Sequence, residues 1–315
     1  MEARDDTPRR TDGTGTDGTG TKGDARVSPY EDRRSHGEAK AVGDGPPDDD
    51  IAIEFRNVSK AFGKKVILKN ASLSIPKGNS VVVMGGSGTG KSVTIKHVVQ
   101  LLEPDEGEIW VLGKRVDTLS KDEMDALRLR IGYLFQSGAL FDSMTVFENM
   151  DFVLSRHTDD KAERRKERIM ETLSWVDIEQ QAGQYPSELS GGQRKRAGLA
   201  RSIILEPEIM LYDEPTTGLD PVSVRNVAHL ITRLRDERGI TSISITHDLL
   251  CAEMISDYIY FLVDQGYEIN GTLPEVAGSD HPFLVEFFGD DATRIAALET
   301  VGGRPVQRSG SKQPA

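Results

Sequence analysis

The chain has 315 residues, of which 37% are hydrophobic and 29% are charged, and this balance is ordinary for a globular protein with a substantial core. The formal net charge of −12 argues against non-specific nucleic-acid binding as a main task, because neutralising phosphates requires a basic surface. No segment approaches the roughly 18 to 20 apolar residues of a membrane-spanning helix, and no apolar run follows the acidic start, so we expect a soluble, cytosolic protein.

Residues 1–50 differ in composition from the rest of the chain. They contain the near-repeat TDGTGTDGTGT and many Asp, Arg and Pro residues, with Tyr30 as their one aromatic residue. Such a segment buries too little apolar surface to offset the entropy cost of ordering it, so we predict a disordered N-terminal tail. The composition also predicts a flexible C-terminal tail over 291–315, which leaves one domain over 51–290.

The first segments after this tail alternate apolar and polar residues. IAIEFRNV, which begins at Ile51, and VILKNASLSIP, which begins at Val66, predict strands of a small antiparallel sheet. The next run, Val81–Met84, is fully apolar and predicts a buried strand of a parallel sheet. A helical pattern follows over Gly90–Leu102.

The middle of the chain favours helices. Ser120–Glu123 and Thr145–Glu148 each have a hydroxyl residue followed three positions later by Glu, which is the capping-box pattern of a helix start. Residues 159–176 are charged and amphipathic, as in an exposed helix. Because 139–205 contains no strand-like run, we predict a helical subdomain there.

Strand and helix patterns alternate again in the last third of the chain. Ile209–Glu214 predicts a buried strand, Pro221–Glu237 a helix with Gly239 beyond its end, and Thr241–Thr246 another strand. This order predicts a mostly parallel α/β sheet covered by helices. The single cysteine, Cys251, cannot form an internal disulfide, and we expect it to be a small buried residue rather than a nucleophile.

A glycine-rich segment, GGSGTGKS, fits the pattern G-x-x-x-x-G-K-[ST] between a buried strand and a helix. Glycines let the backbone wrap closely, so that its N–H groups and the helix N-terminus point at phosphates. We expect Lys91 to contact the β- and γ-phosphates of a nucleotide, and the Ser92 hydroxyl to ligate Mg²⁺. The alternative is a glycine-rich turn without a ligand, which the flanking strand and helix disfavour. The predicted nucleotide-binding residues are Gly85, Gly86, Ser87, Gly88, Thr89, Gly90, Lys91, Ser92 and Thr94.

Two adjacent carboxylates, Asp213 and Glu214, end the apolar strand IMLYDE. Alternation along a strand would point one into the end of the sheet and the other outward, which gives them different roles. Asp213 suits the Mg²⁺ shell, and Glu214 suits polarisation of an attacking water as a general base. Adjacent acids also occur on ordinary surfaces, so this assignment depends on the apolar strand before them.

The segment LSGGQ, from Leu189 to Gln193, resembles the signature motif of ABC ATPases and precedes Asp213 by the spacing that this family shows. Other residues match the same family in order and spacing. Each has a simpler explanation when it is taken alone, as a packing, turn or strand-end residue, but their joint order is typical of the family. The residues that match are Phe62, which resembles the aromatic that stacks on adenine, Gln136, which resembles the Q-loop glutamine, Asp220, which resembles the D-loop aspartate, and His247, which resembles the switch histidine.

The resemblance covers about residues 51–290. It implies a P-loop NTPase ABC cassette with a RecA-like core, an antiparallel β subdomain and an α-helical subdomain. It also implies that the signature segment binds the γ-phosphate held by a second cassette, with which this chain forms a head-to-tail dimer around ATP. The donors in that segment are Ser190, Gly191, Gly192 and Gln193.

The resemblance further implies how ATP is hydrolysed. Glu214 and Gln136 position the attacking water, His247 bonds the γ-phosphate, and Lys91 stabilises the charge on the transferring group. The implied Mg²⁺ ligands are Ser92, Gln136 and Asp213.

Three segments are similar to the ATPase subunits of Mce/Mla-type phospholipid transport systems: LFQSGALFDSMTVFEN, RKRAGLARSI and HPFLVEFFGD. This resemblance implies lipid transport through an integral membrane permease, at the cytoplasmic face of the inner membrane, together with a lipid-binding Mce-type protein. Gln193 is a departure, because this subfamily often has another residue there. One alternative is the ATPase of a polar-solute importer, for example for amino acids. The other is a non-transport ABC protein acting on DNA or ribosomes, which usually carries twin cassettes or a long coiled-coil insertion.

Overall fold

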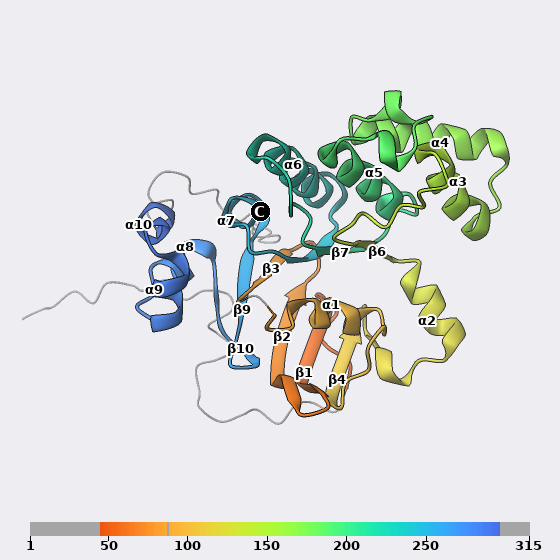
Figure 1. Cartoon of the computed structure of the whole chain (residues 1–315). Coiled ribbons are helices and arrows are strands. Elements are labelled where there is room, and N and C mark those ends of the chain that lie inside the picture. The colour runs from red at the N-terminus through yellow and green to blue at the C-terminus, as the bar shows by residue number, and fades with distance from the viewer. Residues whose placement is uncertain (1–44, 87, 297–315) are drawn as a thin grey trace, which may run out of the picture. The chain divides into compact units, whose positions relative to one another are not determined.

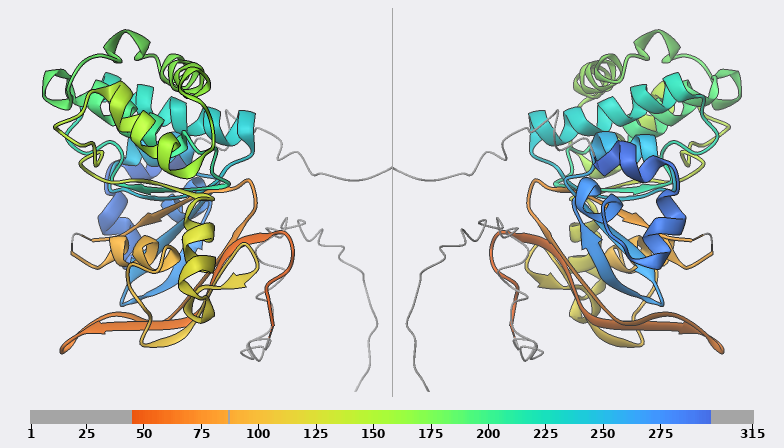
Figure 2. Two further views of the ribbon diagram at one scale, coloured as in Figure 1. Left: turned by 90° about the vertical axis from the view of Figure 1, so that its right-hand side faces the viewer. Right: turned by 90° about the vertical axis from the view of Figure 1, so that its left-hand side faces the viewer.

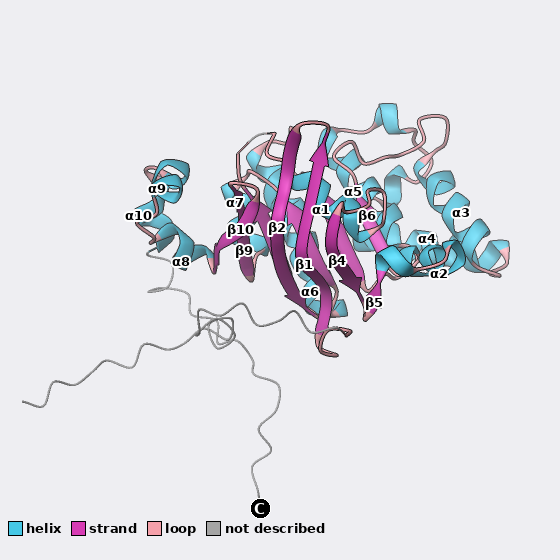
Figure 3. Cartoon of the chain, turned by 90° about the horizontal axis from the view of Figure 1, so that it is seen from below, coloured by secondary structure: helices cyan, strands magenta, loops and turns pink. Residues whose placement is uncertain are grey.

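A computed structural model of the chain describes residues 45–86 and 88–296 (Figure 1). These residues fall within one compact unit that begins at Asp44. Almost all of the predicted N-terminal tail, and the residues beyond 296, therefore lie outside the part of the chain that the structure describes. The described elements build two sheets, which the view in Figure 3 shows by secondary structure.

The first sheet is antiparallel, as the alternating patterns predicted. Its four strands run in the order β2-β1-β4-β5, and all three pairs are antiparallel. Ile53 and Phe55 of β1 point into the core, whereas Glu54 between them is only partly buried. The strands are β1 (Ile51–Phe62), β2 (Lys65–Pro76), β4 (Glu106–Val111) and β5 (Lys114–Arg115).

The second sheet is mostly parallel, which confirms the prediction from the strand and helix order. Its six strands run in the order β10-β9-β3-β8-β7-β6, and every pair from β9 to β6 is parallel, while β10 is antiparallel at one edge. Parallel neighbours end at the same edge of a sheet, so the loops after β3, β6, β7 and β8 meet there. The strands are β3 (Ser80–Met84), β6 (Ile131–Leu134), β7 (Ile209–Asp213), β8 (Thr241–Ile245), β9 (Tyr258–Val263) and β10 (Gly266–Gly271).

Helices cover both faces of the parallel sheet. Helix α1 (Lys91–Val98) lies between the two sheets, where it contacts β4 of one and β7 and β8 of the other. Helices α6 (Pro221–Arg238) and α7 (Leu249–Ile255) cover the opposite face (Figures 1 and 2). The sequence correctly placed the end of α6, because Gly239 follows it with φ at 64°, a left-handed conformation that glycine adopts without strain.

Between residues 139 and 205 the structure contains helices and no strand. Helix α3 (Val146–His157) begins with the capping box predicted at Thr145 and Glu148. The same is true of α2 (Lys121–Arg128), whose capping box joins Ser120 and Glu123. The remaining helices of this helical segment are α4 (Ala162–Trp175), α5 (Gly191–Ile203) and the short 3-10 turns Glu179–Gln181 and Pro186–Glu188.

Three short helices follow the second sheet: α8 (Leu273–Ala277), α9 (Pro282–Phe288) and α10 (Asp291–Ala296). The last one corrects the prediction that a flexible tail begins at residue 291. Ile295 is fully buried, and the Arg294 guanidinium lies 2.9 Å from the Glu253 carboxylate of α7, so these contacts order six further residues. None of the described helices has both the length and the hydropathy needed to cross a membrane.

Candidate functional site

The glycine-rich loop joins the end of β3 to the start of α1, as predicted. The Lys91 ammonium reaches back over the loop and donates to the carbonyl oxygens of Gly85 and Gly86, at 3.0 and 2.9 Å. Burial lowers the pKa of Lys91, while the nearby carboxylates of Glu214 and Asp213 act in the opposite direction. The ammonium is thus held at the mouth of the loop, on the side of the two carboxylates.

Close approach of neighbouring backbone and side chains explains why two positions of this loop need glycine. Gly85 has a φ of 143°, and a Cβ there would lie 2.7 Å from the carbonyl oxygen of Leu262. Gly90 has a φ of 102°, and a Cβ there would lie 2.1 Å from the Ile67 side chain. Thr89 closes the turn by donating to the Gly86 carbonyl at 2.9 Å. Ser87, predicted as a nucleotide contact, lies outside the described residues.

The first of the two carboxylates, Asp213, ends β7 beside the start of α1. Its Oδ1 accepts a hydrogen bond from the Ser92 hydroxyl at 2.7 Å, although the two residues are 121 positions apart in the chain. The Tyr133 hydroxyl of β6 donates to the other oxygen at 3.5 Å. Burial, and then the charge of Asp213, raise the pKa of Tyr133, so its hydroxyl remains a donor. The predicted Mg²⁺ ligands Ser92 and Asp213 are therefore adjacent.

The second carboxylate, Glu214, points elsewhere for a reason that the sequence did not reveal. We attributed the difference to strand alternation, but β7 ends at Asp213, and Glu214 has a φ of 50°, in the left-handed region that non-glycine residues rarely occupy. Its two carboxylate oxygens lie 3.1 and 2.9 Å from Nδ1 of His247. The Thr217 hydroxyl also donates to it, at 3.0 Å.

His247 and Gln136 reach this edge from the strands on either side of β7. His247 follows β8, and its Nδ1 contacts Glu214 although the side chain is 63% exposed. Gln136 follows β6 and is exposed, and its backbone carbonyl accepts a hydrogen bond from the buried side chain of Lys195. We did not predict a role for Lys195. A lysine within the apolar face of the helix after LSGGQ was the only signal for it.

The LSGGQ segment lies at the start of α5. Ser190 is the N-cap, and its hydroxyl accepts from the N–H of Gln193 at 3.3 Å, while the Gln193 side chain accepts from the N–H of Ser190 at 2.9 Å. Gln193 thus completes a capping box. Ser190 and Gly191 are exposed, so the helix start with its free N–H groups faces outward.

Asp220, which the sequence placed in the D-loop, is the N-cap of helix α6. Its carboxylate caps α6 by accepting from the N–H groups of Val222 and Ser223, at 3.0 and 3.1 Å. The Ser223 side chain in turn lies against the signature helix, because a Cβ at Gly192 would lie 3.1 Å from its hydroxyl. A Cβ at Gly191 would likewise lie 3.3 Å from the side chain of Leu219, so the D-loop and the signature segment are in contact within one chain.

Of the two remaining predicted contacts, Phe62 lies near the glycine-rich loop, because its strand partner Lys65 donates to the Gly88 carbonyl at 3.4 Å. Phe62 is at the tip of the β1–β2 hairpin, where its ring is 49% exposed, and the Lys60 ammonium lies 5.7 Å from the ring centroid. Thr94 corrects our prediction. It is fully buried on α1, and its hydroxyl is hydrogen-bonded to the hydroxyl of Tyr267 in β10, so its side chain cannot reach a ligand at the loop.

Together these features define the class of protein. A glycine-rich loop with a lysine opens a helix after the central strand β3. Two acids lie at the end of the parallel strand β7, and the histidine that follows β8 contacts the second of them. Backbone N–H groups and a lysine bind phosphates, and a carboxylate beside them orients a water. This is the site of a P-loop nucleotide hydrolase.

Comparisons with known proteins narrow the class. A family model described as ABC transporter matches residues 68–217. The probable ribonucleotide transport ATP-binding protein mkl of Mycobacterium leprae is 37% identical over 245 residues, which cover 78% of this chain and 71% of that protein. The intermembrane phospholipid transport system ATP-binding protein MlaF of Haemophilus influenzae is 37% identical over 235 residues, 75% of this chain and 89% of that protein.

Solved structures agree. An ATP-binding cassette, determined as a dimer in a post-hydrolysis state with ADP and Pi, is 32% identical and has a TM-score of 0.65, covering 70% of this chain and 98% of its own. This chain belongs to the family of ABC transporter ATP-binding proteins. It is an ABC-type ATPase, and the predicted fold is confirmed.

Proposed function

We propose that this edge of the sheet hydrolyses MgATP, with Glu214 as the general base. The observation that carries the proposal is the position of the Glu214 carboxylate, which His247 and Thr217 hold beside the Asp213–Ser92 pair. A general base must be oriented and close to the phosphate site. His247 orients Glu214 through Nδ1, which leaves its other ring nitrogen to face the γ-phosphate.

The residues present suit a magnesium ion. Ser92 and Asp213 place two oxygen atoms 2.7 Å apart, and oxygen ligands are those that Mg²⁺ prefers when it also binds phosphates and water. We assign these two residues, with the side chain of Gln136, as the protein ligands. When bound, the ion neutralises charge on the β- and γ-phosphates. Lys91 and the N–H groups at the start of α1 hold the same phosphates.

A second copy of the chain completes the site in this proposal. The start of α5 presents the exposed residues Ser190 and Gly191, and a helix N-terminus with free N–H groups binds anions. We propose that it binds the γ-phosphate held by Lys91 of the partner, in a head-to-tail homodimer closed by two ATP molecules.

We further propose that this dimer powers phospholipid transport through a membrane permease. Support comes from the three Mce/Mla-like segments of the sequence and from the MlaF relative, of which the chain covers 89%. We assign the chain to the cytoplasmic face of the inner membrane, with an Mce-type lipid-binding protein in the same system.

The proposed contact with the permease is the surface at the start of the helical segment. Phe141 is 40% exposed there, and its ring packs against that of Phe152 at 5.2 Å between centroids. In this proposal a helix of the permease packs on the exposed ring. The apolar residues that we propose around this surface are the partly exposed Leu140, Met144 and Phe147, whereas Val146, which the sequence pattern also suggested, is fully buried in the core.

A polar-solute transporter is the second candidate, because the mkl relative is named for ribonucleotide transport and is as similar in identity as MlaF. The two candidates share the same ATPase cycle and differ in the cargo of the partner subunits. Purifying the intact complex and measuring its ATPase rate with phospholipid vesicles and with ribonucleotides distinguishes them. Stimulation by ribonucleotides alone, without lipid in the complex by mass spectrometry, would favour the second candidate.

Glu214→Gln tests the ATPase mechanism. The amide cannot accept the proton of the attacking water, so we expect turnover to fall by about 10² or more while ATP binding persists. ATP should then drive the variant into a stable dimer on gel filtration. A normal rate of hydrolysis by Glu214→Gln would contradict the assignment of Glu214 as the general base. An ATP-loaded monomer that hydrolyses ATP normally would contradict the proposed dimer.

A further inference from the structure

One face of the signature helix α5 rests on the Q-loop. Gly198 approaches the loop so closely that a Cβ there would lie 2.9 Å from the carbonyl oxygen of Gly138. The Arg201 guanidinium is hydrogen-bonded to the carbonyl of Ala139. Lys195, three positions before Gly198, is bonded to the carbonyl of Gln136. Three successive contacts on this face therefore attach the Q-loop to α5.

Lys195 also contacts the residue that we propose as the base. Its ammonium donates to the backbone carbonyl of Glu214 at 3.1 Å, and the residue is only 7% exposed. Burying an ammonium is costly unless its donors are paired, and an apolar side chain of similar length would avoid this cost. A buried lysine that joins two loops is therefore better explained by a specific task than by packing.

The backbone of Glu214 is the part of the site that needs support. A non-glycine residue at a φ of 50° is strained by about 1 kcal/mol or more, and the surroundings must hold it there. Its N–H donates to the carbonyl of Ile245 at 2.9 Å, and its carbonyl accepts from Lys195. Both polar groups of this residue are thus held, and the Glu214 carboxylate is aimed at His247.

We propose that Lys195 is a positioning residue for ATP hydrolysis, which holds the Glu214 backbone and the Q-loop together at the root of the signature helix. The inference rests on the proposed function of Glu214. Ser190 lies five positions earlier on the same helix, so binding of the partner's γ-phosphate at Ser190 sets the position of Lys195. Lys195 thus links the nucleotide of one subunit to the base of the other site.

The test is Lys195→Met, which keeps the length of the side chain and removes its donors. We expect kcat to fall at least about tenfold, while KM and the affinity for ATP stay within about twofold, because the phosphate contacts are unchanged. Lys195→Arg should restore kcat to within about threefold, since it keeps a cation with several donors. The matched control is Lys166→Met, the same substitution at an exposed position of α4, which should leave kcat unchanged.

A double variant separates positioning from general support of the fold. If Lys195 acts through the Glu214 side chain, Lys195→Met should lower single-turnover hydrolysis by less than about twofold in a Glu214→Gln background. A general structural role would instead lower it by the same factor in both backgrounds. Full additivity overturns the inference.

The controls keep this inference distinct from the proposed function. A wild-type protein without ATPase activity would contradict the proposed function itself. An active wild type, with Lys195→Met at wild-type kcat or changed only in KM, overturns the role of Lys195 alone. If thermal unfolding shows that Lys195→Met does not fold, Lys195→Leu, which also lacks donors, carries the same prediction. Failure of both to fold makes Lys195 a general structural residue and overturns the inference.

Discussion

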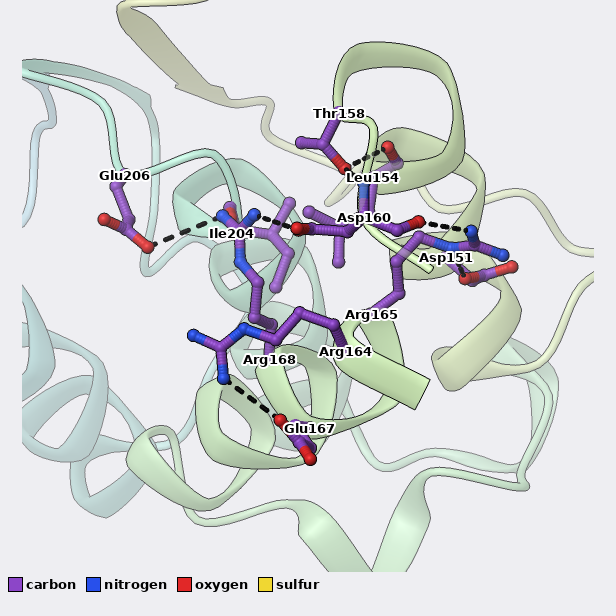
Figure 4. Close-up of polar contacts among 10 residues, drawn as sticks. All are labelled: Asp151, Leu154, Thr158, Asp160, Arg164, Arg165, Glu167, Arg168, Ile204 and Glu206. Atoms are coloured by element: carbon purple, nitrogen blue, oxygen red, sulfur yellow. Dashed lines mark hydrogen bonds and ion pairs between the residues drawn. The ribbon is translucent and has the colours of Figure 1, made fainter. Parts of the chain in front are cut away.

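The parallel sheet and the helical segment are stabilised in different ways. Every residue of β3 and of β8 is buried, including the polar Ser242 and Ser244 of β8, so both strands are fixed by close packing inside the sheet. Helices α3 and α4 also pack on buried apolar residues such as Leu154 and Ile169, but in addition they carry ion pairs at the surface, as Figure 4 shows. Arg165 lies 2.6 Å from Asp151, and Arg168 lies 2.7 Å from Asp160 and donates to the carbonyl of Ile204 at 3.0 Å.

The two regions also have different roles in the proposed mechanism. The sheet holds Lys91, Asp213 and His247 at one edge, and close packing leaves little room for them to shift. The helical segment presents Ser190, which in the proposed dimer approaches and leaves a second subunit. Partly exposed ion pairs contribute little to stability and rearrange easily, so this segment can move without unfolding the sheet.

The largest expected effect is a cavity in the sheet. Leu211 of β7 is fully buried two positions before Asp213, and Leu211→Ala should cost about 2–5 kcal/mol of unfolding free energy. Denaturant unfolding measures the loss. Cys251 offers a second probe, since burial raises the pKa of its thiol to about 12 and keeps it unreactive, so labelling should be faster in the variant. An effect below about 1 kcal/mol would contradict rigid packing of this sheet.

An intermediate effect is expected at the phosphate loop. Lys91→Ala removes the cation at its mouth and should weaken ATP binding by about a hundredfold, because charge-assisted contacts to phosphate are strong. The midpoint of thermal unfolding should barely change. Titration with a fluorescent ATP analogue measures the affinity, with the exposed Lys121→Ala as the control. Unchanged affinity would show that the loop backbone alone binds the phosphates.

The smallest effect is expected in the helical segment. The hydrogen bond from Arg168 lowers the pKa of Asp160, so the stabilisation it provides is present above the ordinary carboxyl range and is lost as the pH falls below about 4. Asp160→Asn removes it at every pH, and hydrogen exchange in α4 should be faster at pH 7 with little change in the unfolding midpoint. The control is Glu167→Gln, whose partner Arg164 is on the same helix. If Asp160→Asn lowered the unfolding midpoint as far as Leu211→Ala does, the proposed difference in stability between the two regions would be wrong.

The sequence by itself determined the local elements and most of the chemistry. Apolar runs and alternation predicted the strands, capping boxes at Ser120 and Thr145 predicted helix starts, and the glycine-rich loop predicted a phosphate site. These features depend on neighbours a few positions apart, and so local patterns carry them. The resemblance to ABC ATPases is also confirmed. It rests on the order of short motifs along the chain, and these motifs too can be recognised from local sequence.

Only the tertiary structure decided which distant groups meet. It put the Thr94 hydroxyl on Tyr267, 173 positions away, and so removed Thr94 from the nucleotide site. It turned Glu214 into a left-handed conformation and brought the buried ammonium of Lys195 to its carbonyl. Such contacts depend on strand order and helix packing, which bring together residues that no local pattern relates.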